Sequence, residues 1–224
     1  MIFITGDTHG DLSRFQKKEA RRLKKGDTLI VCGDFGFLWD GGAKEKRALK
    51  WLQKRKYNIL FLDGKHENYD LLRPYPVTEA FGGRVQALGG GVYHLLRGEV
   101  YELEGKRIFA FGGGESSEKE YRREQDRWWE DELPTGDEMR HAVETLNRCD
   151  RSVDYIVTHE APALVRGLRE DRSDSAGTLG AFFDELARHV AFRCWYFGSV
   201  HFDRRISVKY TAVFDRILPA DAQE

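Results

Sequence analysis

The sequence predicts an α/β protein. Several short apolar runs end in a glycine or a polar residue, and segments with helical spacing lie between some of them. Each run is rich in β-branched or aromatic residues, as expected of a buried strand that brings its carboxyl end to a site. The six runs are MIFITGD, DTLIVCGD, NILFLDG, RIFAFGGG, DYIVTHE and CWYFGSVH.

Length and composition predict one domain over residues 1–224. The chain has 224 residues, of which 41% are hydrophobic, and this is enough for a core of ordinary size. No change in composition marks a second domain. The 36 basic residues nearly balance the 37 acidic residues, so the whole molecule has no strong field that would attract nucleic acid or an anionic membrane.

Cysteine usage and hydropathy favour a cytoplasmic protein. Cys32, Cys149 and Cys194 are odd in number and far apart, with no Cys-x-x-Cys pair, and this pattern suits a reducing compartment. The first apolar run reaches Asp7 too early to leave room for a signal peptide. No apolar stretch approaches the ~18 residues of a membrane span.

The segment 11–27 is expected to be helical, with Gly26 as its stop. Its apolar residues can share one helical face: Leu12, Phe15 and Leu23. Seven basic residues from Arg14 to Lys25 indicate either a nucleic-acid patch or a solvated helix face. The nearly neutral net charge favours the solvated face.

Two later segments depart from this rhythm. Residues 92–111 alternate in polarity around Arg97-Gly98 and around Glu104-Gly105, which predicts antiparallel strands joined by tight turns. Residues 112–140 are polar and aromatic with a glycine-rich start. They predict a surface excursion that returns through a helix near 137–148.

Candidate metal ligands stand at the ends of five of the strand-like runs. A single histidine at such a place would be explained as a buried side chain whose hydrogen bonds are satisfied by the fold. That explanation does not account for all six candidates at strand ends. Carboxylate and imidazole ligands together suit zinc, iron or manganese better than calcium. The candidates are Asp7, His9, Asp34, His66, His159 and His201.

The order of these motifs resembles the calcineurin-like metallophosphoesterases over nearly the whole chain. That family's pattern runs Asp-x-His, Gly-Asp, Gly-Asn-His-Glu or Asp, a lone His, and Gly-His-x-His. The first, second and fourth elements match here as GDTHG, GDFG and THEAP. The resemblance implies a four-layer α-β-β-α sandwich with two metal ions at the strand ends.

The resemblance also implies the ligands of each metal. The second metal would share Asp34 and take its other ligands from the positions of Lys65, His159 and Ser199. The family has Asn where this chain has Lys65, and His where it has Ser199. We therefore expect a complete first site beside a depleted second one, with one or two divalent ions (Mn, Fe or Zn). The implied ligands of the first metal are all present: Asp7, His9, Asp34 and His201.

Lys65 and His66 are the candidate catalytic residues. A neutral Lys65 would need its pKa to fall from ~10.4 to near 7, at a cost of about 4–5 kcal/mol, so a charged ammonium is expected. That ammonium would pair with Asp34 or with a phosphate oxygen. The resemblance implies that His66 protonates the leaving oxygen. The alternative for His66 is packing beneath the site.

Arg122 and Arg123 are candidates for binding a substrate phosphate, with Trp128 and Trp129 stacking on a base. The alternative is that the tryptophans fix the 112–140 excursion to the body of the fold while the arginines pair with nearby acids. We prefer this alternative. The many acidic residues around the arginines discourage a polyanion such as DNA.

The function expected is hydrolysis of a small phosphomonoester or phosphodiester by metal-activated water. The motif GDFGFLW has Phe37 and Leu38 where protein serine/threonine phosphatases of this superfamily have Asp and Arg, which disfavours a phosphoprotein phosphatase. Two alternatives stand beside it. One is an impaired or inactive family member, natural or engineered, that binds a phosphate ligand or a protein partner. The other is a nuclease, supported only by the basic residues between Arg14 and Lys25.

Overall fold

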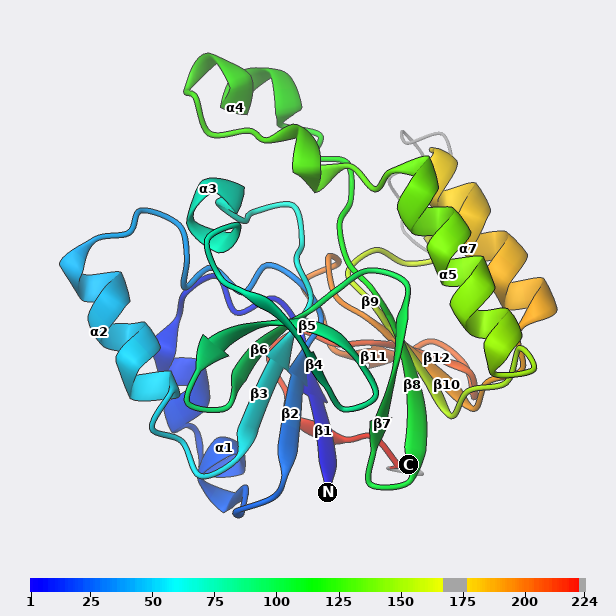
Figure 1. The fold of residues 1–224 in the computed structure, drawn as a ribbon, viewed down its shortest axis with the longest axis horizontal. Coiled ribbons are helices and arrows are strands. Elements are labelled where there is room, and N and C mark those ends of the chain that lie inside the picture. Colours follow the sequence, from blue (N-terminus) through cyan, green and yellow to red (C-terminus); the bar gives the residue numbers. More distant parts are fainter. Residues whose placement is uncertain (167–176, 222–224) are drawn as a thin grey trace.

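Two β-sheets lie face to face in the computed structural model, which describes residues 1–166 and 177–221 (Figure 1). The first sheet has four parallel central strands and antiparallel strands at both edges. Its spatial order is β13 (Leu218–Pro219), β1 (Ile2–Thr5), β2 (Thr28–Val31), β3 (Asn58–Phe61), β6 (Val92–Leu95), β5 (Gly83–Gly89), β4 (Val77–Ala80).

The second sheet also has four parallel central strands between two antiparallel edges. Its order is β11 (Arg204–Arg205), β12 (Tyr210–Ala212), β10 (Cys194–Phe197), β9 (Tyr155–Thr158), β8 (Lys106–Phe111), β7 (Glu99–Leu103).

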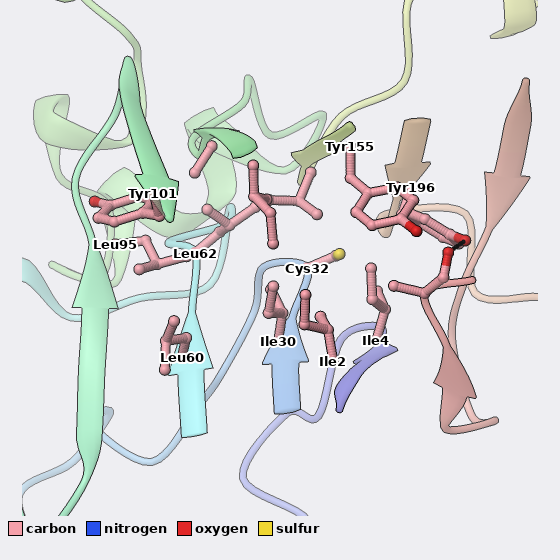
Figure 2. Close-up of a cluster of buried hydrophobic side chains, with 14 of the residues drawn as sticks. Ile2, Ile4, Ile30, Cys32, Leu60, Leu62, Leu95, Tyr101, Tyr155 and Tyr196 are labelled. Carbon is pink, nitrogen blue, oxygen red and sulfur yellow. Dashed lines mark hydrogen bonds between the residues drawn. The ribbon is translucent and has the colours of Figure 1, made fainter. Parts of the chain in front are cut away.

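Strand periodicity divides the side chains between two cores. In β2, Ile30 points between the sheets while Leu29 and Val31 point to the outer face. The core between the sheets joins aliphatic side chains of β1, β2 and β3 to Tyr155 and Tyr196 of the second sheet (Figure 2).

Helices cover the outer face of each sheet. The first sheet packs against η1 (Leu12–Gln16), α1 (Lys18–Arg22), α2 (Ala43–Leu52) and α3 (Tyr69–Leu72). The second packs against α5 (Gly136–Arg148), α6 (Ala163–Arg166) and α7 (Thr178–His189), on the opposite side of the molecule (Figure 1). The fold is therefore the four-layer α-β-β-α sandwich that the resemblance implied.

The six predicted strands are confirmed as β1, β2, β3, β8, β9 and β10. The helix predicted near 137–148 is confirmed as α5, which begins with a capping box between Thr135 and Glu138. The excursion before it contains α4 (Lys119–Glu124) and η2 (Glu130–Glu132), and α4 projects beyond the ends of the sheets (Figure 1). Among the described residues, no helix combines the length and apolarity that a membrane crossing needs.

The prediction of one helix over 11–27 is wrong, because the backbone breaks at Lys17, where ψ is 159°. The break follows from Arg14, whose buried guanidinium donates to the carbonyls of Asp7 and Phe214 and so draws the first turn against the strand ends. Lys17 pairs with Asp215. A helical period could not reveal these tertiary contacts.

The turn at Arg97-Gly98 does not join paired strands as expected. β6 belongs to the first sheet and β7 to the second, so the chain crosses between the sheets there. The Glu104-Gly105 turn does join a hairpin, β7 to β8, with both residues at positive φ. Arg97 is buried against Asp63. This long-range contact accounts for the crossover, and the local turn sequence does not reveal it.

Candidate metal centre

The candidate ligands gather where the carboxyl ends of parallel strands from both sheets meet. Asp7 follows β1, Asp34 follows β2, His159 follows β9 and His201 follows β10. The two sheets supply ligands to a common place, since His159 Nδ1 lies 3.6 Å from Asp7 Oδ1 and His159 Nε2 lies 3.7 Å from Asp34 Oδ1.

The four residues expected to hold the first metal form one cluster. Each offers a ligand atom, and these atoms lie within 4.8 Å of one another. His201 Nε2 is 3.2 Å from His9 Nε2 and 3.1 Å from Asp7 Oδ2, and two ligands of one ion at about 2.1 Å can have such separations. Two carboxylates with two imidazoles fit a divalent transition metal. The members are Asp7, His9, Asp34 and His201.

Backbone donors hold both carboxylates of this cluster. Asp34 Oδ1 accepts the N–H groups of Lys65 at 2.6 Å and His66 at 2.8 Å, and Asp7 Oδ2 accepts the N–H of Ser199 at 2.9 Å. A carboxylate has about four lone-pair sites, so these contacts leave oxygen sites for a metal. A Cβ on Gly64 would lie only 2.0 Å from Asp34 Oδ1, so the loop after β3 needs glycine there.

Several residues of the site adopt a backbone conformation that L-residues seldom take. The φ angles are 44° at Asp34, 47° at His9, 53° at His201 and 64° at Ser199. Such conformations persist where surrounding contacts impose them, and they concentrate at functional sites.

Electrostatics couples the buried acids to the histidines. Burial opposes ionisation of Asp34, but His159 and His66 outweigh it and hold the pKa of that carboxyl well below its usual range. Burial likewise opposes the charging of His159, while Asp34 and Asp7 raise the pKa of its imidazole above the ordinary value. A divalent cation suits the same negative pocket, since it would meet the two buried carboxylates directly.

Lys65, where the resemblance implies a ligand of the second metal, forms an ion pair instead. Lys65 Nζ lies 2.7 Å from Glu160 Oε1, and the two side chains are only 21% and 5% exposed. The fully buried His159 Nε2 has no hydrogen-bond partner, so this nitrogen is available as a ligand. The sequence reasoning missed Glu160, although its place directly after His159 at a strand end was the available signal.

His66 lies between the cluster and the excursion. Its Nδ1 is 2.9 Å from Asp34 Oδ2, and its Nε2 is 3.8 Å from Glu118 Oε2. Its ring centre is 5.8 Å from that of His9 and 6.4 Å from that of Trp39. Glu118 is a second acid that the sequence did not single out, since only the folded excursion brings it to His66.

Arg122 and Arg123 differ in placement. Arg122 is buried, donates to Glu132 Oε2 at 2.9 Å and also donates to the carbonyl of Lys65, so it ties the excursion to the loop after β3. Arg123 lies outside, 5.1 Å over the Trp128 ring. Their assignment to substrate binding stays a prediction.

A family model described as calcineurin-like phosphoesterase matches residues 1–182. The chain belongs to the calcineurin-like phosphoesterases. In general terms it is therefore a hydrolase of phosphoesters that uses divalent metal ions. The implied sandwich fold and the cluster of Asp7, His9, Asp34 and His201 agree with this membership.

Solved structures similar to this calcineurin-like phosphoesterase include two enzymes. Phosphopantetheinyl hydrolase from Mycobacterium tuberculosis is 16% identical with a TM-score of 0.45, over 95% of this chain and 89% of that one. A putative 5'-nucleotidase from Staphylococcus aureus, in complex with alpha-ketoglutarate, is 12% identical with a TM-score of 0.49, over 95% of this chain and 48% of that one. The comparison with curated protein sequences gave no match.

Proposed function

We propose that this chain hydrolyses a small phosphomonoester or phosphodiester with a complete first metal site and a depleted second one. The observation that carries the proposal is the contrast at Asp34. On one side four ligand atoms lie within 4.8 Å of one another, and on the other Lys65 pairs with Glu160 at 2.7 Å. His159 is the imidazole that we assign to the second position.

The metal cluster, His66, Lys65 and Asp34 have different roles in the proposed reaction. A divalent ion held by Asp7, His9, Asp34 and His201 would supply Lewis-acid chemistry for the attack of water on the phosphate. We assign His66, whose Nδ1 lies 2.9 Å from Asp34 Oδ2, to delivery of a proton to the leaving oxygen. The Lys65 ammonium supplies a positive charge toward the phosphate, moderated by its partner Glu160. Asp34 orients both halves, because its two oxygens contact the Lys65 and His66 amides and the His66 ring.

The test is a metal count combined with an assay. The purified chain is loaded with manganese, iron or zinc in turn, the ions bound per chain are counted, and 4-nitrophenyl phosphate and bis(4-nitrophenyl) phosphate are supplied as substrates. Hydrolysis that disappears with a chelator and returns with the metal supports the proposal. A chain that binds no ion under these conditions contradicts it.

The Lys65–Glu160 pair also favours a second candidate, an impaired family member that binds a phosphate ligand or a protein partner without turnover. In that case Lys65→Asn combined with Ser199→His creates hydrolysis where the unmodified chain has none. High activity of the unmodified chain removes this candidate.

The nuclease alternative has lost part of its only support. Arg14 is buried in contacts with Asp7 and Phe214, and Lys17 pairs with Asp215, so neither is presented as part of a free basic patch. We retain a small phosphorylated compound as the substrate rather than nucleic acid.

Cys32, Cys149 and Cys194 are free thiols, which supports a reducing compartment such as the cytoplasm.

A further inference from the structure

A cleft of about 830 Å³ opens beside the metal cluster on the side of His66. It lies between η1, the loop after β2 and the helix α2, and both His9 and His66 line it. Its volume is within the range of pockets that hold small organic molecules. None of its other lining residues belongs to the metal centre, so it is a separate compartment that shares one wall with the site.

The cleft is continuous with the proposed place of the leaving group. The ring centres of His9 and His66 are 5.8 Å apart, and those of His66 and Trp39 are 6.4 Å apart. A phosphate on the cluster with its leaving oxygen at His66 therefore directs the rest of the alcohol past His66, along Trp39.

The walls of the cleft are apolar and aromatic. They are formed by Leu12, Phe37, Trp39, Ala48 and Trp51. Trp39 is fixed at its backbone, because its N–H donates to Glu45 Oε1 at 2.6 Å and its carbonyl accepts from Asn68 Nδ2 at 2.8 Å. Its indole packs edge-on against Trp129, with centres 6.1 Å apart. The guanidinium carbons of Arg122 and Arg127 lie over the indole, 5.8 and 6.0 Å from its centre, so they take part of its surface. The part of the fixed indole that lines the cleft is the platform for stacking.

The polar groups of the cleft carry both signs. Its carboxylates accept backbone donors, Asp11 from Ser13, Asp40 from Gly42 and Glu45 from Trp39. Lys44 and Arg47 of α2 add two cations. Mixed charge does not select a second strongly anionic group, since three carboxylates repel it. It suits an uncharged ring with hydrogen-bonding substituents.

We propose that this cleft binds the leaving group of the substrate and selects a phosphoester whose alcohol carries a flat, uncharged aromatic ring that stacks on Trp39. The inference rests on the proposed function, because it takes the phosphate to lie on the metal cluster. Trp39 determines specificity and takes no part in the proton transfer.

The test compares phenyl phosphate with ethyl phosphate on the manganese-loaded chain. The experiment measures the ratio of the two kcat/KM values in each variant. The intrinsic reactivity of the two esters is the same in every variant, so a change in this ratio reports the effect of the substitution. Stacking on an aromatic side chain is worth about 1–3 kcal/mol, so Trp39→Leu is expected to reduce the preference for the phenyl ester about tenfold. Trp39→Phe is expected to keep most of it. The control Tyr121→Leu removes an aromatic side chain that is 64% exposed on α4, away from the cleft, and leaves the ratio unchanged.

A second variant and a second measurement protect the test against misfolding or loss of hydrolysis. Ala48→Phe fills the cleft from α2 and is expected to reduce turnover of phenyl phosphate while sparing ethyl phosphate. Binding of phenol to the loaded chain, followed by tryptophan fluorescence, is expected to weaken about tenfold in Trp39→Leu.

The two proposals fail in different ways. If the unmodified chain hydrolyses no ester but binds phenol, and Trp39→Leu binds phenol more weakly, the proposed function is overturned and the aromatic cleft is supported. Hydrolysis with an unchanged ratio and unchanged phenol binding in both cleft variants overturns the cleft alone.

Discussion

The two halves of the site are held by different forces. Around the first metal position, backbone N–H groups and close glycines hold Asp7 and Asp34. Near this cluster and behind it, charged side chains pair with one another: Lys65 with Glu160, Arg122 with Glu132, and Asp63 with Arg97. A carboxylate held by amides keeps lone pairs and its full charge for a cation, whereas one paired to an ammonium is already neutralised. We therefore expect the two metal positions that the resemblance implies to differ in their readiness for metal.

The change that most severely breaks the first half is Asp34→Asn. The amide loses the negative charge, and its nitrogen can no longer accept from His66. We expect the metal to be lost and kcat/KM to fall by about a thousandfold or more, as expected for loss of the metal's electrostatic stabilisation. Metal content and hydrolysis of 4-nitrophenyl phosphate measure the effect. The exposed Asp137 gives a control in Asp137→Asn, and equal losses in both variants would contradict the assignment.

Among the ion pairs, we expect the largest loss of stability on breaking the one between Asp63 and Arg97, which lies behind the site. This buried carboxyl contacts Arg97 and also His94, at 3.1 Å. Asp63→Asn leaves the Arg97 charge without its main partner, and we expect the free energy of unfolding at pH 7 to fall by about 3–5 kcal/mol. Asp131→Asn, which breaks an exposed pair with Arg73, serves as the control and should cost less than about 1 kcal/mol.

The same carboxyl predicts a pH dependence. Burial opposes its ionisation, but Arg97 and His94 outweigh burial and hold the pKa of Asp63 well below the usual value. A lowered pKa means that the stabilisation is complete above the unfolded-state value of about 3.9 and is lost as the pH falls through the folded-state pKa. Thermal melts from pH 7 to pH 2 should therefore show the gap between the unmodified chain and Asp63→Asn narrowing below about pH 4. A constant gap would argue against ionised Asp63.

His66 joins the two halves, and its replacement separates chemistry from metal binding. His66→Asn removes the proton donor, and we expect about a hundredfold loss of kcat with an alkyl phosphate, whose leaving group needs a proton. The loss should be smaller with 4-nitrophenyl phosphate, and metal content should be unchanged. His189→Asn, on the exposed end of α7, is the matched control. An equal loss with both esters would instead indicate a packing role.

The smallest expected effect is on activity when the family's ligands for a second metal are restored. Lys65→Asn together with Ser199→His removes the ammonium and restores the Asn and His that the family has at these two positions. We expect the ion count to rise from one to two per chain and kcat to rise about tenfold, because a second metal stabilises the transition-state charge. Lys65→Asn alone should not raise the ion count, which separates the ligand effect from the loss of the charge. Two ions already present in the unmodified chain would break the comparison.

Local sequence patterns predicted much of this protein. Short apolar runs ending in polar residues located six strands, and their strand-end positions marked the candidate ligands. The family resemblance implied which of these share one metal, and the structure brings these four together: Asp7, His9, Asp34 and His201. The departures at Lys65 and Ser199 were also visible in the sequence, because each falls at a motif position. Strand identity and strand-end residues are local properties of the chain.

Only the tertiary structure decided what those residues contact. The break at Lys17, the crossover at Arg97-Gly98 and the partnership of Lys65 with Glu160 all depend on segments far apart in the chain. The cleft lined by Trp39 exists because η1, a loop and α2 converge beside His66. Long-range contacts have no period, so the sequence shows which groups the site contains, while packing determines which of them stay available to a metal or a substrate.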